Sequence, residues 1–351
     1  MNNKQSPKRR RSGVDTTLFL VLVIIVAVIA NIFIFSGLRS EHTPKDNADL
    51  RTETEKIEKD PDPSQSDISD APSVIIPENY KSISIDSDEM HFGELVLING
   101  EYPHVADGVH NVTRYETPVD VYANKNKNYA VKDMSIDLNP IVIENLNAMF
   151  NDYVAFSGAA DVYINAAYRS HEDQQAIYDQ KGSDIAALPG YSEHHSGYAF
   201  DVAVHSGGKY SAISDTGHFT WLPENCKKYG FIRRYPEGKT DITGITFEPW
   251  HYRFVGVPHS YYIMENSLTL EEYVKLLKSY TLMGEHLTVS AGDKNYEIYY
   301  VPAGQGTTEI FVPTDKAYTI SGNNIDGFVV TVDLSATPAA DAATENAEIA
   351  A

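Results

Sequence analysis

The 351-residue chain contains a single cysteine, Cys226. A disulfide within the chain is therefore impossible, and a zinc site built from several thiolates is excluded. Cys226 falls in an apolar-periodic segment (residues 221–229), so we expect a buried and unreactive thiol. Basic residues are also scarce, with 28 Lys and Arg against 49 Asp and Glu and a net charge of −21. This balance argues against a nucleic-acid partner, because phosphate backbones are bound by Lys and Arg.

A long apolar run stands near the N-terminus, from Leu18 to Phe35, interrupted only by Asn31 and preceded by a cluster of Lys and Arg. The run is just long enough to span a bilayer as a helix. It predicts a cytoplasmic basic tail over residues 1–17 and a transmembrane signal anchor over residues 18–38, with the remainder of the chain outside the cell. The alternatives are a cleaved signal peptide, for which no small-x-small cleavage site follows closely, and a buried core helix.

The composition changes several times along the chain, and we find no internal repeats. Residues 39–79 are acidic and poor in apolar side chains, which predicts a disordered stalk. Residues 80–281 hold mixed helix and strand patterns and are expected to form the main domain. Short alternating segments separated by Gly and Asn turns predict a small all-β module over residues 282–335. The alanine-rich residues 336–351 are expected to be a disordered tail.

The main domain is expected to be α+β, with an antiparallel sheet and flanking helices, because strands and helices do not alternate with a fixed period. Asn139 and Pro140 predict the cap and first residue of a helix that ends before Gly158, and Thr269 predicts the cap of another. The expected strands are residues 94–99, 162–167, 199–204, 231–232 and 245–254, and the further expected helices are residues 171–181, 215–229 and 268–280.

Two short segments combine metal-binding residue types with an additional carboxylate. The run from Ser192 to Asp201 contains His194, and Glu248-Pro249-Trp250-His251 follows about fifty residues later. Two histidines, one aspartate and one further glutamate are the parts of a catalytic zinc site, which uses three protein ligands, an open position for water and a base that is not a ligand. Taken alone, Asp201 could instead be an exposed strand residue.

The second segment poses a geometric question, because residues three apart on a regular strand point to opposite faces. Pro249 cannot donate to a strand ladder, so we expect an interruption there that brings Glu248 and His251 into one cleft. Without such a break, Glu248 would be an edge-strand carboxylate and His251 a packed histidine under Trp250.

Together these motifs resemble those of the VanY-type D-alanyl-D-alanine carboxypeptidases, zinc peptidases of the cell wall in the group that includes lysostaphin-like enzymes and the hedgehog fold. The matching patterns are Ser192-x-His194-x-x-Gly197-x-Ala199-x-Asp201, then Glu248-x-Trp250-His251, and a Tyr-Arg-Ser-x-x-x-Gln segment over residues 168–174. The resemblance extends from about Leu95 to Leu277. Tyr198 and Phe200 are bulkier than the family's usual residues, and no catalytic group is missing.

The resemblance implies that His194, Asp201 and His251 bind Zn²⁺ and that Glu248 is the catalytic base. It also implies that Arg169 holds the substrate carboxylate and that Ser192 and Gln174 contact the substrate. The role of Arg169 suits its residue type, because a planar guanidinium binds a terminal carboxylate through two parallel hydrogen bonds. His195 is expected to lie either beside a ligand or in solvent. His205, His218 and His259 are expected to be ordinary polar residues.

The expected function is that of a membrane-anchored, extracytoplasmic zinc carboxypeptidase that removes a terminal D-alanine from peptidoglycan stem peptides. One alternative is an endopeptidase or amidase on the same fold, which Arg169 disfavours because an internal bond has no free carboxylate. Another is a non-catalytic wall-binding protein with a structural zinc, which Glu248 disfavours because a structural site needs no base. The β module is expected to be a binding or spacing element. The sequence leaves open whether the residue before the cleaved D-alanine is D or L.

Overall fold

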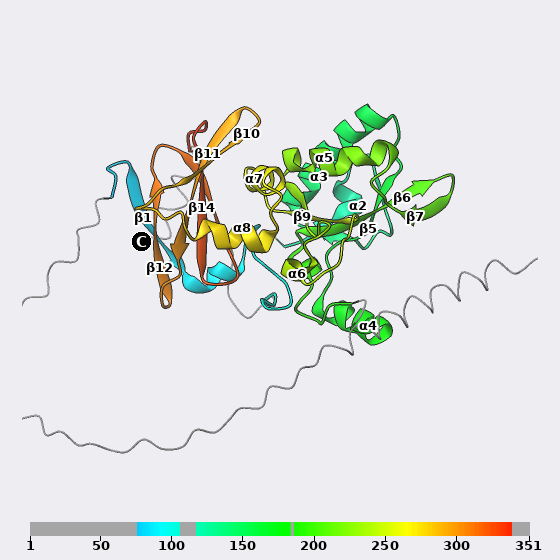
Figure 1. Ribbon diagram of the computed structural model, residues 1–351, viewed down its shortest axis with the longest axis horizontal. Helices are drawn as coiled ribbons and strands as arrows, with labels where there is room; N and C mark the ends of the chain where they lie inside the picture. The colour runs from blue at the N-terminus through cyan, green and yellow to red at the C-terminus, as the bar shows by residue number, and fades with distance from the viewer. Residues whose placement is uncertain (1–75, 106–116, 184–185, 339–351) are drawn as a thin grey trace, which may run out of the picture. The chain divides into compact units, whose positions relative to one another are not determined.

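The structure is a computed structural model that describes residues 76–105, 117–183 and 186–338 (Figure 1). The predicted cytoplasmic tail, transmembrane helix, most of the stalk and most of the C-terminal tail lie outside the described residues. Within the described part of the chain, no helix is both long and apolar enough to cross a membrane. Asn79, at the end of the predicted stalk, already accepts a hydrogen bond from the backbone N–H of Thr314.

A six-stranded sheet forms the centre of the main domain, as expected for a mixed α and β fold. Its order is β3-β5-β6-β9-β8, with β7 also paired to β6, and every pairing is antiparallel except that of β3 with β5. These strands are β3 (Ala130–Val131), β5 (Val162–Ala166), β6 (Ala199–Ser206), β7 (Lys209–Ala212), β8 (Phe231–Arg233) and β9 (His251–Phe254). A separate short pair joins β2 (Val119–Asp120) to β4 (Asp137–Leu138).

Helix α3 (Pro140–Ser157) covers one face of this sheet with an apolar stripe. The stripe consists of Val142, Ile143, Leu146, Met149, Phe150 and Tyr153, all of them buried in one core with Ile164, Phe200 and Tyr252 of the sheet. The other helical elements are α2 (Val121–Asn124), α4 (His171–Lys181), η2 (Glu193–Ser196), η3 (Gly217–Thr220), α5 (Trp221–Asn225), η4 (Cys226–Tyr229), α6 (Thr240–Thr243), α7 (His259–Glu265) and α8 (Leu270–Leu277). With one face of the sheet buried beneath α3, the opposite face is left to carry the functional side chains.

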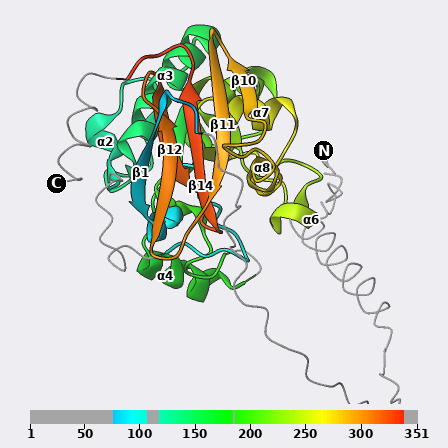
Figure 2. The same cartoon turned by 90° about the vertical axis from the view of Figure 1, so that its left-hand side faces the viewer.

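The C-terminal module consists of two packed sheets. One has the order β10-β11-β14-β13, and the other pairs β1 with β12. Their bounds are β1 (Tyr80–Asp86), β10 (Leu287–Ala291), β11 (Lys294–Pro302), β12 (Thr307–Pro313), β13 (Ala317–Gly322) and β14 (Gly327–Asp333), with the 3-10 helix η1 (Ser87–His91) after β1. Figures 1 and 2 show the blue β1 beside the orange β12. The module therefore takes in a strand from the start of the region that we assigned to the main domain.

The module is packed against the main domain rather than tethered to it by a linker. Ile298, Tyr300 and Val329 of its larger sheet share one buried apolar cluster with Tyr273 and Leu277 of α8. The apolar face of α8 packs into this cluster, and a capping box fixes the residue at which the helix begins. The Thr269 hydroxyl accepts from the backbone of Glu272, whose carboxylate accepts from the backbone of Thr269.

Several expected elements differ in the structure. Residues 94–99 form no strand, because the carbonyls of Glu94 and Val96 accept hydrogen bonds from the Arg253 guanidinium instead of a neighbouring strand. The helix expected over residues 215–229 is divided into η3, α5 and η4, and Asp215, at its expected start, pairs with Arg233 through its carboxylate. The strand expected over residues 245–254 is confined to β9, because the chain turns before His251.

Candidate active site

A tight turn presents His194, the first predicted metal ligand. Residues of η2 precede Gly197, whose φ of 70° lies in the left-handed region that glycine tolerates. A Cβ on Gly197 would lie 2.8 Å from a carbon of Pro118 and 2.9 Å from the side-chain oxygen of Asn139. The Asn139 side chain donates to the Ser196 carbonyl and makes no cap bond to α3, although Asn139 stands at the cap position. Asn139 therefore joins the start of α3 to the turn that carries His194.

Three predicted metal ligands meet on the open face of the sheet. Asp201 on β6 is paired directly with His251 on β9, which places their side chains on the same face. His194 Nε2 lies 3.6 Å from Asp201 Oδ1, and His251 Nδ1 lies 2.9 Å from the same oxygen. One donor atom from each of the three residues falls within 4.8 Å of the others. The structure thus brings His194 and His251, which are 57 positions apart in the sequence, to one place together with Asp201, as the motifs predict.

The other ring nitrogen of each histidine is already committed, which fixes the nitrogen left for a metal. His194 Nδ1 donates to the Ala167 carbonyl at 2.7 Å, so Nε2 presents its lone pair to the site. His251 Nε2 faces Glu193 Oε2 at 3.3 Å, so Nδ1 is the nitrogen turned toward Asp201. Such outer contacts orient metal-binding histidines in zinc proteins.

The donor set fits zinc. Tetrahedral ligands with bonds of about 2.0–2.1 Å lie about 3.3 Å from one another, close to the separations found here. Burial lowers the pKa of His251, but its hydrogen bonds with Asp201 and Glu193 outweigh this effect and raise that pKa to about 9. The raised pKa reflects the negative charge that Asp201 and Glu193 place beside this ring, a charge that also favours a bound cation. Burial lowers the pKa of His194 to about 4, which keeps it neutral and able to bind a metal.

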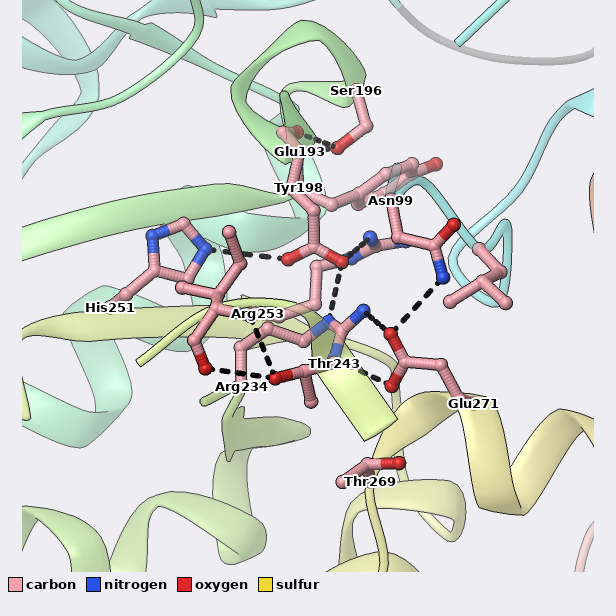
Figure 3. A network of polar contacts seen from close by, with 12 residues as sticks. Asn99, Glu193, Ser196, Tyr198, Arg234, Thr243, His251, Arg253, Thr269 and Glu271 are labelled. Carbon is pink, nitrogen blue, oxygen red and sulfur yellow. Dashed lines mark hydrogen bonds and ion pairs between the residues drawn. The ribbon is translucent and has the colours of Figure 1, made fainter. Parts of the chain in front are cut away.

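Glu193 is a buried residue beside the candidate metal donors that the sequence reasoning missed. Its carboxylate is wholly buried, and Figure 3 shows it between the His251 ring and the guanidinium groups of Arg234 and Arg253. Oε1 accepts from Arg234 Nε at 2.7 Å and from Arg253 Nη1 at 3.0 Å, while Oε2 faces His251. Burial by itself would raise the pKa of Glu193, but the two arginines hold it well below its usual range. Glu193 is therefore ionised beside His251, one of the three candidate metal ligands.

The two arginines extend this network to the rest of the molecule. Arg234 also makes a bidentate pair with Glu271 of α8, at 2.9 and 2.6 Å. Arg253 donates to the carbonyls of Glu94 and Val96, both at 2.9 Å. Both guanidinium groups are completely buried. The His251 ring is thus connected through buried charges to the helix on which the C-terminal module packs.

Glu248 lies beside the three candidate metal ligands without belonging to that group. It precedes β9 in a turn whose backbone bonds to Tyr235, and its Oε2 is 4.0 Å from His251 Nδ1. Its side chain is 26% exposed and lines the cleft, so solvent reaches it. Burial raises the pKa of Glu248, and Asp201 and Glu193 raise it further against the opposing effect of His251. The interruption at Pro249 thus brings Glu248 and His251 to one cleft, as expected.

Arg169 and Gln174 form a second polar group in the same cleft. Arg169 Nη1 donates to Gln174 Oε1 at 2.7 Å, and Gln174 Nε2 donates to the Ala187 carbonyl at 2.6 Å. Gln174 lines the cleft, but only 1% of it is exposed to solvent. Its side-chain oxygen is bound by the Arg169 guanidinium rather than being free to contact a substrate. Ser192 is buried at the cleft wall, next to Glu193.

Three other histidines singled out from the sequence, His195, His218 and His259, have partners outside the group of metal donors. His195 is buried, and its Nδ1 donates to the Arg169 carbonyl at 2.7 Å while its Nε2 accepts from Gly190 N. Burial lowers the pKa of His195 to about 4. It therefore fixes the backbone that carries Arg169. His218 pairs with Asp161, and His259 is buried between Tyr273 and Thr331.

The cleft that joins these groups has a volume of about 720 Å³. Its lining includes the three candidate metal ligands, Glu248, Arg169 and the apolar side chains of Ile177, Leu188 and Trp250. A site with two imidazoles, a carboxylate ligand, a separate carboxylate and an arginine can hydrolyse a bond beside a free carboxylate.

Comparisons with known proteins agree with this chemistry. The family model of VanY, D-alanyl-D-alanine carboxypeptidase, matches residues 135–257. A D-alanyl-D-alanine carboxypeptidase of Enterococcus faecium is 38% identical over 259 residues, which cover 73% of this chain and 80% of that protein. The chain belongs to the VanY-type D-alanyl-D-alanine carboxypeptidase family. The VanY-type peptidases are zinc enzymes, and the zinc cofactor predicted from the motifs is confirmed by this membership together with the donor set.

Solved structures include other VanY-type enzymes. The D,D-dipeptidase VanXYg, solved with a D-Ala-D-Ala phosphinate analogue, has a TM-score of 0.63 and 33% identity, and the match covers 72% of this chain and 99% of that one. The mixed α and β fold is therefore that of the VanX and VanY zinc peptidases. A variant of the D,D-pentapeptidase VanY from a VanB-type cassette, solved with Zn(II), has a TM-score of 0.40 and 29% identity over 52% of this chain and 98% of that one.

Proposed function

We propose that this enzyme removes the terminal D-alanine from peptidoglycan stem peptides, with His194, Asp201 and His251 as the ligands of its zinc. The observation that carries the proposal is the placement of Glu248 and Arg169 in one cleft around these three donors. Bound zinc supplies an activated water and polarises the scissile carbonyl.

Glu248 is the proton carrier of the proposed reaction. Its carboxylate lies beside the metal donors but is not one of them, and its pKa is raised by burial, which suits a group that must accept and then release a proton. It takes the proton of the attacking water and delivers it to the amine of the departing D-alanine. The water oxygen first bonds to the penultimate carbonyl carbon, and the bond from that carbon to the amine breaks afterwards, as Glu248 protonates the departing nitrogen.

Arg169 orients the substrate through its terminal carboxylate. Gln174 accepts from Nη1 of the guanidinium, and Arg169 lines the cleft that also holds the metal donors. This contact supports a carboxypeptidase rather than an endopeptidase or amidase, because an internal bond offers no free carboxylate. Hydrolysis of the free dipeptide D-Ala-D-Ala is a second candidate activity, favoured by the likeness to the D,D-dipeptidase VanXYg.

We further propose that residues 18–38 anchor the enzyme in the cell membrane with its catalytic domain outside. The support is the basic cluster followed by the apolar run, which places positive charge on the cytoplasmic side. Protease added to intact cells should then digest the catalytic domain. Protection of that domain until the cells are lysed would contradict the proposed topology.

Release of D-alanine from defined stems tests the activity. The zinc-loaded chain should shorten a pentapeptide stem by one D-alanine, detected by mass spectrometry, and a parallel tetrapeptide stem would reveal whether an L residue before D-alanine is accepted. Glu248→Gln should lower kcat about 10²- to 10⁴-fold, the usual share of a general base, while zinc stays bound. Glu224→Gln changes an exposed glutamate of α5 and is the matched control with unchanged turnover. A folded, zinc-loaded chain that releases no D-alanine would refute the proposal.

A further inference from the structure

Three histidine rings contact one another in a group that is separate from the candidate zinc ligands. The ring centroid of His104 lies 5.7 Å from those of His171 and His195, and the latter two centroids are 4.1 Å apart. The rings come from distant parts of the sequence, because His104 lies between η1 and β2, His171 is the first residue of α4 and His195 belongs to η2. None of the three lines the active-site cleft. Histidine is the commonest protein ligand of transition metals, so this group is a second place to look for a metal.

His195 supports the group but is not free to bind a cation. Its Nδ1 donates to the Arg169 carbonyl, and its Nε2 accepts from the backbone N–H of Gly190 at 3.0 Å. Both ring nitrogens are therefore committed to the backbone. The ring itself packs against His171 and limits the positions that the His171 side chain can take.

The other two histidines present nitrogen atoms to each other. His104 Nδ1 lies 3.4 Å from His171 Nε2, which is longer than the usual range of about 2.7–3.2 Å for a hydrogen bond from an N–H donor. Two ligands of a tetrahedral zinc ion, with bonds of about 2.0–2.1 Å, stand about 3.3 Å apart. Burial lowers the pKa of His104 to about 4, so its ring is neutral at physiological pH and keeps a lone pair for a metal.

The backbone around the two rings is fixed by hydrogen bonds. The backbone N–H of His104 donates to the Gly190 carbonyl at 2.7 Å, and the Ser170 hydroxyl caps the helix that begins at His171. Gly190 has a φ of 91°, and a Cβ there would lie 3.7 Å from the His171 ring. Both His104 and His171 are partly exposed, so a cation can reach them from solvent. The pair is thus held in place and accessible before any ion binds.

We propose that His104 Nδ1 and His171 Nε2 form a second site for a divalent transition-metal cation, with water completing its coordination. Two imidazoles select such ions, Zn²⁺ among them, over Mg²⁺ and Ca²⁺, which prefer oxygen ligands. With two protein ligands instead of three, this site binds zinc more weakly than the catalytic site. The site is independent of the catalytic reaction, since neither histidine lines the cleft.

The bound ion has a mechanical consequence for the active-site wall. It joins two residues that are 67 positions apart in the sequence and fastens the first residue of α4 to the segment that follows η1. Gln174 and Ile177 of the same helix line the cleft. An ion that binds only the folded chain raises its stability, so occupation of this site should stabilise the protein beyond the effect of the catalytic zinc.

The experiment titrates Zn²⁺ into the full chain that already carries one equivalent of zinc. Calorimetry should show a second, weaker equivalent that raises Tm and that excess Mg²⁺ does not displace. Cu²⁺ added in place of the second Zn²⁺ should give an electron paramagnetic resonance spectrum split by two imidazole nitrogens. His104→Phe and His171→Phe keep a ring for packing but lose the ligand nitrogen, so each should lose the second equivalent and its rise in Tm while keeping the first. His104→Gln, which retains a polar side chain, should behave in the same way.

His205→Phe provides the matched control, because the His205 ring stacks on Tyr210 and not on another histidine. It should keep both equivalents. The proposal is overturned if the wild-type chain binds a single equivalent, if the second equivalent persists in His104→Phe or His171→Phe, or if His205→Phe loses it to the same extent. Retention of the first equivalent in every variant shows that the chain is folded and that the loss is confined to the second site.

Discussion

Glu193 Oε2 lies 3.3 Å from Nε2 of His251, so the ring nitrogen that faces away from the metal site is bound by a carboxylate. Two buried arginines hold that carboxylate ionised inside the protein. The arrangement leaves Nδ1 of His251 as the metal-binding nitrogen and fixes the plane of its ring. Glu193, which is next to His194 in the chain, thereby orients the ring of His251.

Glu193→Gln should lower zinc affinity about 10- to 100-fold, the usual effect of losing a group that orients a metal ligand. The measurement is competition for Zn²⁺ against a chromophoric chelator. The same change leaves two buried guanidinium groups without their shared anion, so the free energy of unfolding should fall by several kcal/mol. Glu271→Gln is the matched variant, because it weakens Arg234 pairing but keeps the contact between Glu193 and His251. Equal zinc affinity in the two variants would contradict the orienting role.

Arg169→Lys should reduce preference for a free carboxylate. Lysine keeps the positive charge but loses the planar fork that binds a carboxylate through two hydrogen bonds. We expect kcat/KM for a D-alanine-terminated peptide to fall about 10- to 100-fold, as for the loss of a charged hydrogen bond. The readout is the ratio of that value to the value for the corresponding C-terminal amide. A ratio unchanged from the wild type would show that Arg169 binds some other part of the substrate.

Gln174→Glu should also weaken carboxylate binding, through the guanidinium and not through direct contact. Gln174 accepts a hydrogen bond from Arg169 with a neutral oxygen, and a carboxylate in that place would neutralise the charge needed by the substrate. KM should rise with little change in kcat. Gln175→Glu alters the adjacent exposed glutamine of α4 and serves as the control. Equal KM values for the two variants would speak against this role.

His259 should make the protein less stable in acid. Burial lowers its pKa to about 3, whereas an unfolded histidine titrates near about 6.5. Below about pH 6.5 the unfolded state binds a proton that the folded state excludes, so the free energy of unfolding falls by up to about 1.4 kcal/mol per pH unit toward about pH 3. His259→Gln, which can still bond to Tyr273 and Thr331, should flatten this acid limb in denaturant titrations. Parallel limbs in the two proteins would exclude His259 as their source.

Cys226 should resist alkylation in the folded protein. Its side chain is fully buried, and burial raises the pKa of the thiol to about 12, so the reactive thiolate is suppressed at neutral pH. Iodoacetamide should label the denatured chain and leave the native chain unmodified, as measured by mass spectrometry. Rapid labelling of the native protein would mean that the helix pair around Cys226 opens readily.

The sequence predicts that His194, Asp201, His251 and Glu248 lie in one cleft because each stands in a short motif whose residue types have few other uses. Glu193 offers no such signal, since an acidic residue in a polar turn is usually solvated. Its partners Arg234 and Arg253 lie 41 and 60 positions away in the sequence. They come within hydrogen-bonding distance of Glu193 only when β6, β8 and β9 assemble. An arginine between Tyr252 and Phe254 in an apolar strand is the available hint of a buried charge pair.

The bounds of the C-terminal module were harder to predict, because one of its strands comes from a distant part of the sequence. Alternation within Tyr80–Asp86 is short, and nothing local indicates that its partner is β12, which begins at Thr307. The strand expected over residues 94–99 was wrong because its carbonyls are bound by a side chain from β9. Local patterns specify the elements, whereas the pairing of distant segments depends on packing that no single segment encodes.

The pairing of β1 with β12 also has a consequence for the order in which the protein matures. During synthesis β1 leaves the ribosome long before its partner strand is made, and the whole catalytic domain is translated in between. The peptidase domain can begin to fold while the edge of β1 is still unpaired. The β module is completed only when almost the entire described chain has left the ribosome. A ribosome that stalls before Thr307 would therefore release a chain with a complete set of metal donors and an open strand edge.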